Sequence, residues 1–370
     1  MAERPARGGV VKVVLSPDLT HAQHAAVRAF CDASPGYSYL QDPDWPDVMQ
    51  GEGGRHSYRH VLVERDAGGL AAYGVLRLSP VPGGLALGAF RRGPVVAAPA
   101  DLEPVLRVLL PALRNAGLIT VAMNPRWEDA EAETVEQVLA RLGGQVAPPA
   151  RQRLHSCTGL IDLAPVPEEI FAACTAHARR NLRKLDKLGL TLRPVADGAE
   201  MVRVRDWTEA FARARDLTTR GLPGLEAQRD WIARHGGALV MVEAEGAPVG
   251  AFSLLRDGPR LLNMSNGWAD PDARLPRSYL VYWYAIRRWA GNAEPDGPRW
   301  LDLAGRDDPR VPRSDAGAEG RERFKDGFPQ RHVVLPRMHR FVLRPLLARA
   351  LDGVERLRAQ GQRSKVTAPR

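Results

Sequence analysis

The sequence predicts an α+β protein made of two similar units, each with a mixed sheet and helices. Each half contains a helical stretch, then two strand-like runs separated by a glycine-containing turn, then a further helix and strand. The chain has 370 residues, which is more than one hydrophobic core usually serves. The order of elements repeats although identity between the halves is low. We therefore expect two copies of one structural pattern.

The first half contains the elements of this pattern in sequence order. They are a helix at His21–Ala33, strands at Tyr58–Glu64 and Ala71–Leu78, a helix that Asp101 can cap and that ends at Gly117, and a strand at Leu118–Met123. The strands flank Asp66-Ala67-Gly68-Gly69, a turn typical of a hairpin.

The second half repeats this order with two helices at its start. The expected elements are helices at Pro167–Leu188 and Trp207–Thr219, strands at Ala238–Ala244, Pro248–Leu255 and Arg260–Met264, a helix at Tyr279–Trp289, and a strand at Trp300–Leu303.

Proline residues near position 165 mark the expected boundary between the two units. The predicted domains are residues 1–164, residues 165–337, and a C-terminal segment 338–370. That last segment contains an amphipathic helix at Phe341–Arg358 and a disordered end.

Composition limits the classes of protein to consider. No apolar run approaches the roughly 20 residues that span a membrane, and the N-terminus lacks the apolar core of a signal peptide, so we expect a cytoplasmic protein. Three scattered cysteines and the histidine spacing predict neither disulfides nor a metal site. A net charge of +9 would attract an anionic partner, but a proline- and arginine-rich composition also raises the pI without any nucleic-acid role.

The most charged local feature is the helix around position 180. It presents a stripe of cations, namely Arg179, Arg180, Arg183, Lys184 and Lys187. Such a stripe can be a solvated surface, or it can bind the phosphates of a nucleotide or tRNA, because arginine matches phosphate geometry.

The segment Phe324-Lys325-Asp326-Gly327-Phe328 places a lysine between two phenylalanines. A lysine held against aromatic rings is partly shielded from water, so its charge can stabilise an oxyanion or a phosphate. Taken alone, the segment favours an exposed edge-strand lysine with two core phenylalanines over a catalytic lysine. Hydrolase and P-loop motifs are missing from the sequence.

Several segments, in order, resemble motifs of the FemABX aminoacyl-tRNA-dependent peptidyltransferases, which have paired acetyltransferase-like (GNAT-type) domains. The matching segments are Gln41-Asp42-Pro43-Asp44-Trp45, Arg92-Gly93-Pro94-Val95, Arg180-Asn181-Leu182-Arg183-Lys184 with Gly189, Ser278-Tyr279-Leu280, Leu301-Asp302-Leu303-Ala304-Gly305 and Phe324-Lys325-Asp326-Gly327-Phe328. The resemblance extends from about Gln41 to Leu335.

The resemblance implies transfer of an amino acid from aminoacyl-tRNA, as co-substrate, to an amine, with no other cofactor. Lys325 and Phe324 are then the expected catalytic residues, and the cationic stripe is expected to bind tRNA phosphates. Arg220 is carried over as a ligand of an acceptor phosphate. Tyr279, Trp45 and Asn124 are the other expected substrate-binding residues.

The acceptor implied by the resemblance is a cell-wall peptide precursor or a small natural-product amine or peptide. Family members that use a nucleotide-linked precursor have a lysine shortly after the tryptophan, whereas this chain has Pro46-Asp47-Val48-Met49. It also lacks the heptad insertion of some members, which disfavours a coiled-coil dimer and leaves the oligomeric state undetermined.

Two other functions fit the same pattern of elements. An acyl-CoA-dependent transferase would need a glycine-rich loop for the pyrophosphate, where this chain has residues 274–279 without glycine. A non-catalytic RNA-binding protein would keep the cationic stripe but have no use for Phe324-Lys325.

Overall fold

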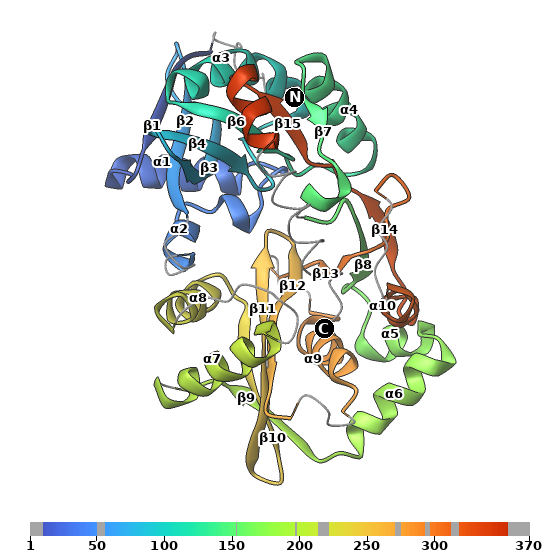
Figure 1. The fold of residues 1–370 in the computed structure, drawn as a ribbon. Coiled ribbons are helices and arrows are strands. Elements are labelled where there is room, and N and C mark those ends of the chain that lie inside the picture. Colours follow the sequence, from blue (N-terminus) through green and yellow to red (C-terminus); the bar gives the residue numbers. More distant parts are fainter. Residues whose placement is uncertain are drawn as a thin grey trace, which may run out of the picture.

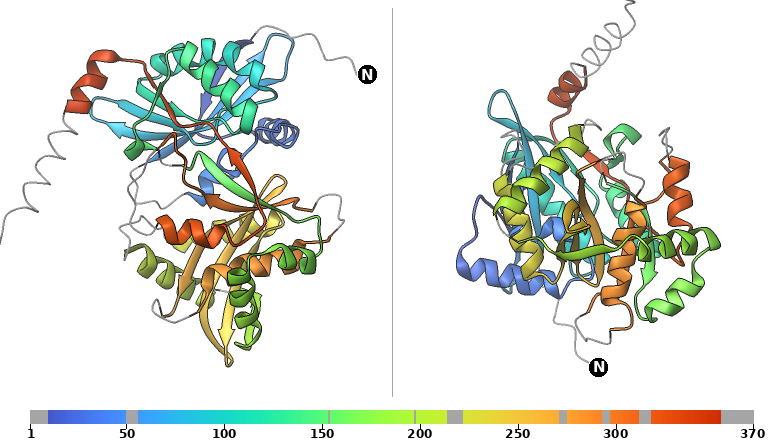
Figure 2. Two further views of the ribbon diagram at one scale, coloured as in Figure 1. Left: turned by 90° about the vertical axis from the view of Figure 1, so that its right-hand side faces the viewer. Right: turned by 90° about the horizontal axis from the view of Figure 1, so that it is seen from below.

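The computed structural model describes residues 10–49, 56–152, 154–196, 198–213, 222–270, 275–292, 297–311 and 318–353. Two sheets with flanking helices lie one above the other, in an α+β arrangement (Figure 1). Figure 2 shows the same two units from two further directions. The predicted fold class, two tandem units with mixed sheets, is confirmed.

The first sheet has eight strands. In spatial order they are β1 (Val10–Ser16), β2 (Ser57–Arg65), β3 (Leu70–Val81), β4 (Leu85–Phe90), β6 (Leu118–Met123), β15 (His339–Val342) and β7 (Gln145–Val146), with β5 (Val95–Val96) paired to β3. The predicted hairpin is present as β2 and β3, and its turn residues Gly68 and Gly69 have φ of 86° and 80°, values that glycine adopts without strain.

Helices cover both faces of the first sheet because side chains alternate along its strands. Val61 and Val63 pack under α3 (Leu102–Asn115) and α4 (Asp129–Arg141). Leu62 packs under α1 (His21–Asp32), whose first turn is closed by a capping box. The remaining helices of this unit are short: α2 (Trp45–Val48) and the 3-10 turns Tyr39–Gln41, Pro99–Asp101 and Pro149–Arg151.

The second sheet has seven strands. In spatial order they are β14 (Arg331–Val334), β8 (Cys157–Asp162), β13 (Trp300–Gly305), β12 (Arg260–Trp268), β11 (Ala247–Asp257), β10 (Ala238–Ala244) and β9 (Leu190–Pro194). Its helices are α5 (Pro167–Ala173), α6 (Ala176–Asp186), α7 (Gly198–Arg213), α8 (Leu222–Arg234), α9 (Arg277–Trp289) and α10 (Ala318–Lys325). Figure 1 shows α7 and α8 on one side of this sheet and α9 on the other.

Several elements differ from their predicted forms. The helix expected at Pro167–Leu188 is divided into α5 and α6, because the Thr175 side chain accepts a hydrogen bond from Ala178 N and starts a new helix. Asp101 stands at the start of α3, but its side chain makes no capping hydrogen bond. The helix α4 was not predicted, and the end of the helix expected to reach Thr219 lies outside the described residues.

The C-terminal segment also differs from its predicted form. Where the amphipathic helix was expected to start, β15 pairs with β6, and a helix follows at residues 345–353. The predicted disordered end lies outside the described residues. The domain boundaries at 164 and 337 stay predictions. In the structure, β8 pairs within the second sheet and β15 pairs within the first.

Within the described parts of the chain, the helices are too short or too polar to cross a bilayer.

Candidate active site

The second sheet opens between two parallel strands. β12 and β13 are paired from Arg260 and Trp300 to Leu262 and Asp302, and beyond that point both strands continue unpaired with each other. In the first sheet, the corresponding parallel strands β4 and β6 are paired from Ala86 and Leu118 to Phe90 and Met123, with one register shift. Beyond Asp302, side chains rather than β12 satisfy the carbonyl oxygens of Leu303, Ala304 and Gly305 of β13.

Lys325 lies at the open end of β13. It is the last residue of α10, and its ammonium donates hydrogen bonds to the carbonyl oxygens of Gly305 and, at 3.4 Å, of Ala304. The side chain is buried. An ammonium has three N–H donors, so these two bonds leave one for another acceptor. Burial lowers the pKa of Lys325 below the ordinary value.

The segment that ends at Lys325 is the helix α10, not the edge strand that was one interpretation of the sequence. Phe324 packs edge-on against Tyr279, with 4.8 Å between ring centroids, and also contacts Tyr282 and Phe328. Tyr279 and Tyr282 come from α9, and the Tyr282 hydroxyl donates to the carbonyl of Leu303 at 3.3 Å. The structure therefore brings Phe324, Lys325 and Tyr279 together beside β13.

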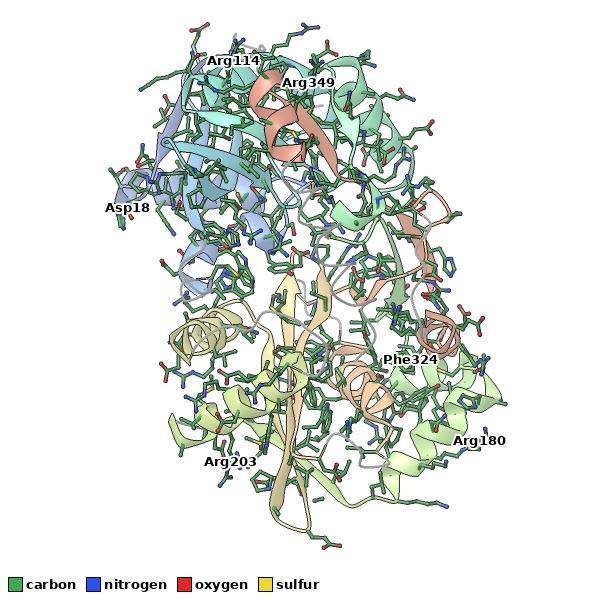
Figure 3. All side chains as sticks on the ribbon, viewed as in Figure 1. Asp18, Arg114, Arg180, Arg203, Phe324 and Arg349 are labelled. Carbon is green, nitrogen blue, oxygen red and sulfur yellow. The ribbon has the colours of Figure 1, made fainter. Side chains whose placement is uncertain are left out.

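The cationic helix α6 lies next to the turn that follows Lys325. Thr175 N, at its start, donates to the carbonyl of Gly327 at 3.0 Å. Figure 3 shows Arg180 and Phe324 on the same side of the second unit, with Arg203 of α7 on the other side. The exposed cations of α6 and its C-cap are Arg180, Arg183, Lys184 and Lys187.

Arg179 differs from the other members of the stripe. Its guanidinium donates to the carbonyl oxygens of Ala172 and Cys174, at 2.9 and 2.5 Å. Arg179 therefore satisfies carbonyl oxygens at the C-terminal end of α5, and fewer of its N–H donors are left for a phosphate.

Two other expected site residues, Trp45 and Asn124, have other contacts, and a third lies outside the described residues. Trp45 is only 2% exposed and packs edge-on against Tyr39 and Trp231, at 4.7 and 5.3 Å between centroids, where the two units meet. Asn124 is buried, and its Oδ1 accepts from Arg92 N at 3.0 Å. Arg220 lies outside the described residues.

Sequence reasoning missed a group of ionisable residues where the units meet, all of them buried except the half-buried His155. Its members are Arg92, Arg126, His155, Asp257, Arg260 and Asp302. Arg92 and Asp302 belong to segments that carry the family resemblance, but the sequence of those segments did not indicate that these two side chains are buried together. Arg126 and Arg260 carry no local signal, because only the packing of two distant segments brings them together.

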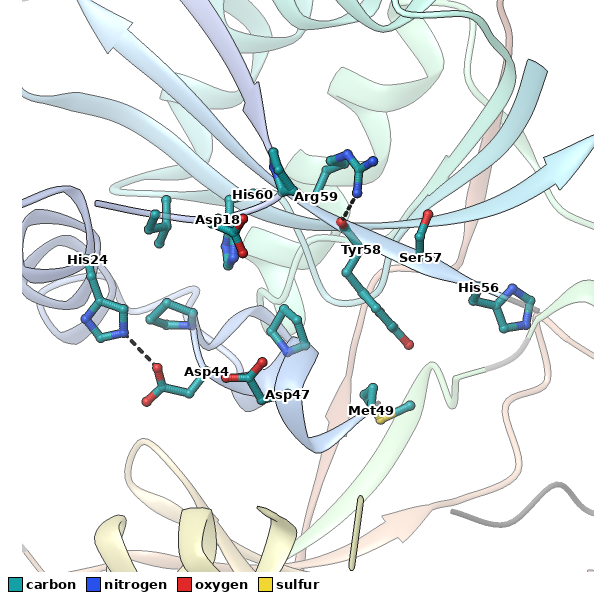
Figure 4. Close-up of a pocket in the computed structure, with 14 residues that line it drawn as sticks. Asp18, His24, Asp44, Asp47, Met49, His56, Ser57, Tyr58, Arg59 and His60 are labelled. Atoms are coloured by element: carbon teal, nitrogen blue, oxygen red, sulfur yellow. Dashed lines mark hydrogen bonds and ion pairs between the residues drawn. The ribbon is translucent and has the colours of Figure 1, made fainter. Parts of the chain in front are cut away.

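A cavity of about 480 Å³ lies in the first unit (Figure 4). Its lining includes three aspartates, Asp18, Asp44 and Asp47, and Asp44 accepts from His24 at 2.7 Å. Another cavity, of about 410 Å³, is lined by Gly305, Arg306 and Glu322, and the carbonyl of Gly305 accepts a hydrogen bond from Lys325.

Residues 172–326 match the acetyltransferase (GNAT) domain family. The chain carries two GNAT-like units in tandem. The crystal structure of FemX superposes on it with a TM-score of 0.72 at 14% identity, covering 92% of this chain and 99% of that chain.

Two more distant structures share the fold. L-PGS from Bacillus licheniformis has a TM-score of 0.53 at 11% identity, covering 90% of this chain and 95% of its own. A conserved protein of unknown function from Bacteroides thetaiotaomicron has a TM-score of 0.52 at 10% identity, covering 89% and 100%. No curated protein matches the sequence. At these identities the structures establish the fold alone, and together with the family match they support an acyltransferase of GNAT-like fold.

Proposed function

We propose that the chain transfers an amino acid from aminoacyl-tRNA to an amine acceptor, with Lys325 stabilising the oxyanion. The observation that carries this proposal is the position of the Lys325 ammonium. It is buried at the open end of β13 and bound by carbonyl oxygens rather than by a carboxylate. Its charge is therefore not neutralised by its hydrogen-bond partners, and one N–H remains for a developing negative oxygen.

The reaction needs little beyond positioning and charge stabilisation, because the ester of aminoacyl-tRNA is already activated. The neutral amine attacks the ester carbonyl and forms a C–N bond. The oxyanion of the tetrahedral intermediate accepts a hydrogen bond from the remaining N–H of Lys325. The C–O bond to the tRNA then breaks, and the proton lost by the amine ends on the released hydroxyl.

The exposed cations of α6 support a nucleic-acid co-substrate. Arg183 and Lys184 lie on the helix that abuts the turn after Lys325, so phosphates bound there would hold the 3′ end near the reaction centre. Arg179 has a smaller part in this proposal, since its guanidinium caps α5.

The start of α9 disfavours CoA as the acyl donor. Its first residue, Arg277, stacks on Trp268 at 5.2 Å from the ring centroid and donates to the carbonyl of Asp270. A pyrophosphate that approached the backbone N–H groups of this turn would meet those side chains.

We propose a small amine or peptide as the acceptor, rather than a nucleotide-linked precursor. The segment after Trp45 contributes Pro46, Asp47 and Met49 to the 480 Å³ cavity, where a lysine stands in relatives that use such a precursor. Carboxylates repel phosphates, and they attract an ammonium.

The test incubates purified protein with charged tRNA and a panel of amines, following amide formation by mass spectrometry. Parallel reactions contain acetyl-CoA in place of charged tRNA. We expect amide only with charged tRNA. Acyl transfer from acetyl-CoA, with none from charged tRNA, would overturn the proposal.

A further inference from the structure

A small cavity of about 60 Å³ lies between the two units, and three buried arginine side chains line it. Arg92 and Arg126 come from the first unit and Arg260 from the second. They are only 5%, 6% and 3% exposed. Three buried guanidinium groups need negative charge nearby, because burying a charge without a partner costs free energy.

Two of the three arginines have carboxylate partners. Arg126 pairs with Asp257 at 3.0 Å. Arg260 pairs with Asp302 at 3.2 Å and also with Glu128.

Arg92 has no carboxylate partner among the described residues. Its Nη2 donates to the carbonyl of His155 at 2.6 Å, and its Nη1 is buried with no hydrogen-bond partner in the described structure. Burial and the nearby Arg126 lower the pKa of Arg92 to about 10, so its guanidinium stays charged at neutral pH. Burial lowers the pKa of His155 to about 3, so the imidazole adds no charge there.

The backbone at the cavity is held in an unusual conformation on both sides. Arg92 has φ of 62° and Ala304 has φ of 60°, values that residues other than glycine rarely adopt. Asn124 holds the Arg92 backbone through the hydrogen bond described above. Such conformations persist where the surrounding structure fixes them, and they cluster at ligand sites.

We propose that this cavity binds a carboxylate group through the free Nη1 of Arg92. A volume of about 60 Å³ exceeds the ~10–15 Å³ that one water molecule requires, so the cavity admits a small group such as a carboxylate and is too small for a nucleotide. The carbon attached to the carboxylate would contact Leu40, Leu154 and Leu262, which also line the cavity. Asp257 and Asp302 also line the cavity, so its lining carries three guanidinium groups against two carboxylates, and a bound carboxylate would pair with the third guanidinium, that of Arg92.

The carboxylate has two possible sources, a free small anion or the carboxylate end of the acceptor. The second source rests on the proposed function, because the cavity adjoins Ala304, whose carbonyl binds Lys325. The first can be tested without any assumption about catalysis.

The first experiment measures binding of acetate to the full chain. The melting temperature is followed as acetate replaces a bulky sulfonate at constant ionic strength, with chloride as a third anion. We expect a saturable rise with acetate that exceeds the rise with chloride. An equal effect of chloride and acetate overturns the assignment to a carboxylate.

Variants then locate the effect. Arg92→Met should weaken acetate binding at least tenfold, whereas Arg107→Met, at an exposed helix position, should keep the wild-type response. Leu262→Phe serves as a second variant, because the larger side chain fills the cavity and leaves Arg92 in place. Unchanged acetate binding in both Arg92→Met and Leu262→Phe would refute the site.

The second experiment identifies the source. Paired acceptors that differ only in a free carboxylate or its primary amide are compared in the transfer assay. If the acceptor is the source, the carboxylate form should have a kcat/KM at least tenfold higher with wild type, and Arg92→Met should remove the difference. Equal use of both forms excludes the acceptor as the source. Absence of transfer with every acceptor contradicts the proposed function and leaves the acetate result standing.

Discussion

Replacing Lys325 with methionine tests the centre of the proposed mechanism. Methionine has a similar length and no charge, so Lys325→Met removes the oxyanion donor with little change in volume. Loss of one preorganised donor costs about 2.7–4 kcal/mol in the transition state, which corresponds to about 10²–10³ in kcat. Because the interaction forms only in the transition state, KM for charged tRNA should stay within about threefold.

The same substitution has opposing effects on stability. It removes the hydrogen bonds from the ammonium to Ala304 and Gly305, each worth about 1.5–3 kcal/mol. It also removes the cost of burying that ammonium. We expect the free energy of unfolding to change by no more than about 2 kcal/mol, which is a shift of a few degrees in Tm.

The assay measures single-turnover transfer from charged tRNA, together with Tm. Arg323→Met is the matched control, because Arg323 is exposed on the same helix. A kcat within threefold of wild type for a folded Lys325→Met would refute the oxyanion role. If the methionine variant does not fold, Lys325→Arg keeps a charge and tests the same role through pH dependence.

The pH dependence follows from the lowered pKa of Lys325. The charged form is needed, so kcat should fall as pH rises through a pKa below the ordinary 10.5 of lysine. Lys325→Arg should move this alkaline loss to higher pH. Spontaneous hydrolysis of the ester is subtracted at each pH, and an alkaline limb that is unchanged in Lys325→Arg would assign it to another group.

Three further predictions concern other parts of the chain. The double change Arg183→Glu and Lys184→Glu should weaken charged-tRNA binding at least tenfold. The slope of log K against log salt concentration should become shallower by about 1 for each phosphate contact that is lost. Arg203→Glu on α7 should have no effect. The pKa of His155 is about 3 in the folded chain and 6.5 in the unfolded chain, so below pH 6.5 the unfolded chain binds a proton that the folded chain does not. The free energy of unfolding should therefore fall by up to about 1.4 kcal/mol for each pH unit below 6.5 because of this group. Urea unfolding of His155→Gln between pH 6.5 and 4.5 should show a shallower decline, and an unchanged slope would contradict this assignment. Trp45→Ala should lower the free energy of unfolding by about 3–5 kcal/mol, because its ring fills the junction between the units, and a loss under 1 kcal/mol would contradict that packing.

Local patterns in the sequence were enough to predict the elements whose signals are local. The strand Leu118–Met123 was predicted with its observed bounds, and the hairpin of β2 and β3 was predicted from its glycine turn. The break between α5 and α6 was missed, because a threonine inside a polar helical stretch looks like any other helix residue until its side chain caps Ala178.

Long-range pairing explains most of what the sequence did not show. The four residues of β15 are too few to be distinguished from the amphipathic helix expected there, and their strand form depends on pairing with β6, more than 200 positions earlier. The same holds for the candidate site. Phe324 and Lys325 could be selected because they are adjacent, but the unpaired guanidinium of Arg92 depends on where Asp257 and Asp302 lie after folding.

The position of β15 has a consequence for folding during synthesis. β6 has β4 on one side and β15 on the other, and β15 in turn pairs with β7. While the ribosome makes residues 147–338, β6 therefore lacks a neighbour along one edge, although the rest of its sheet is already complete. An open edge of this kind is a site for unwanted pairing with other chains. The whole second unit must be made before the first can close, so its rate of synthesis sets how long the nascent chain is exposed to aggregation.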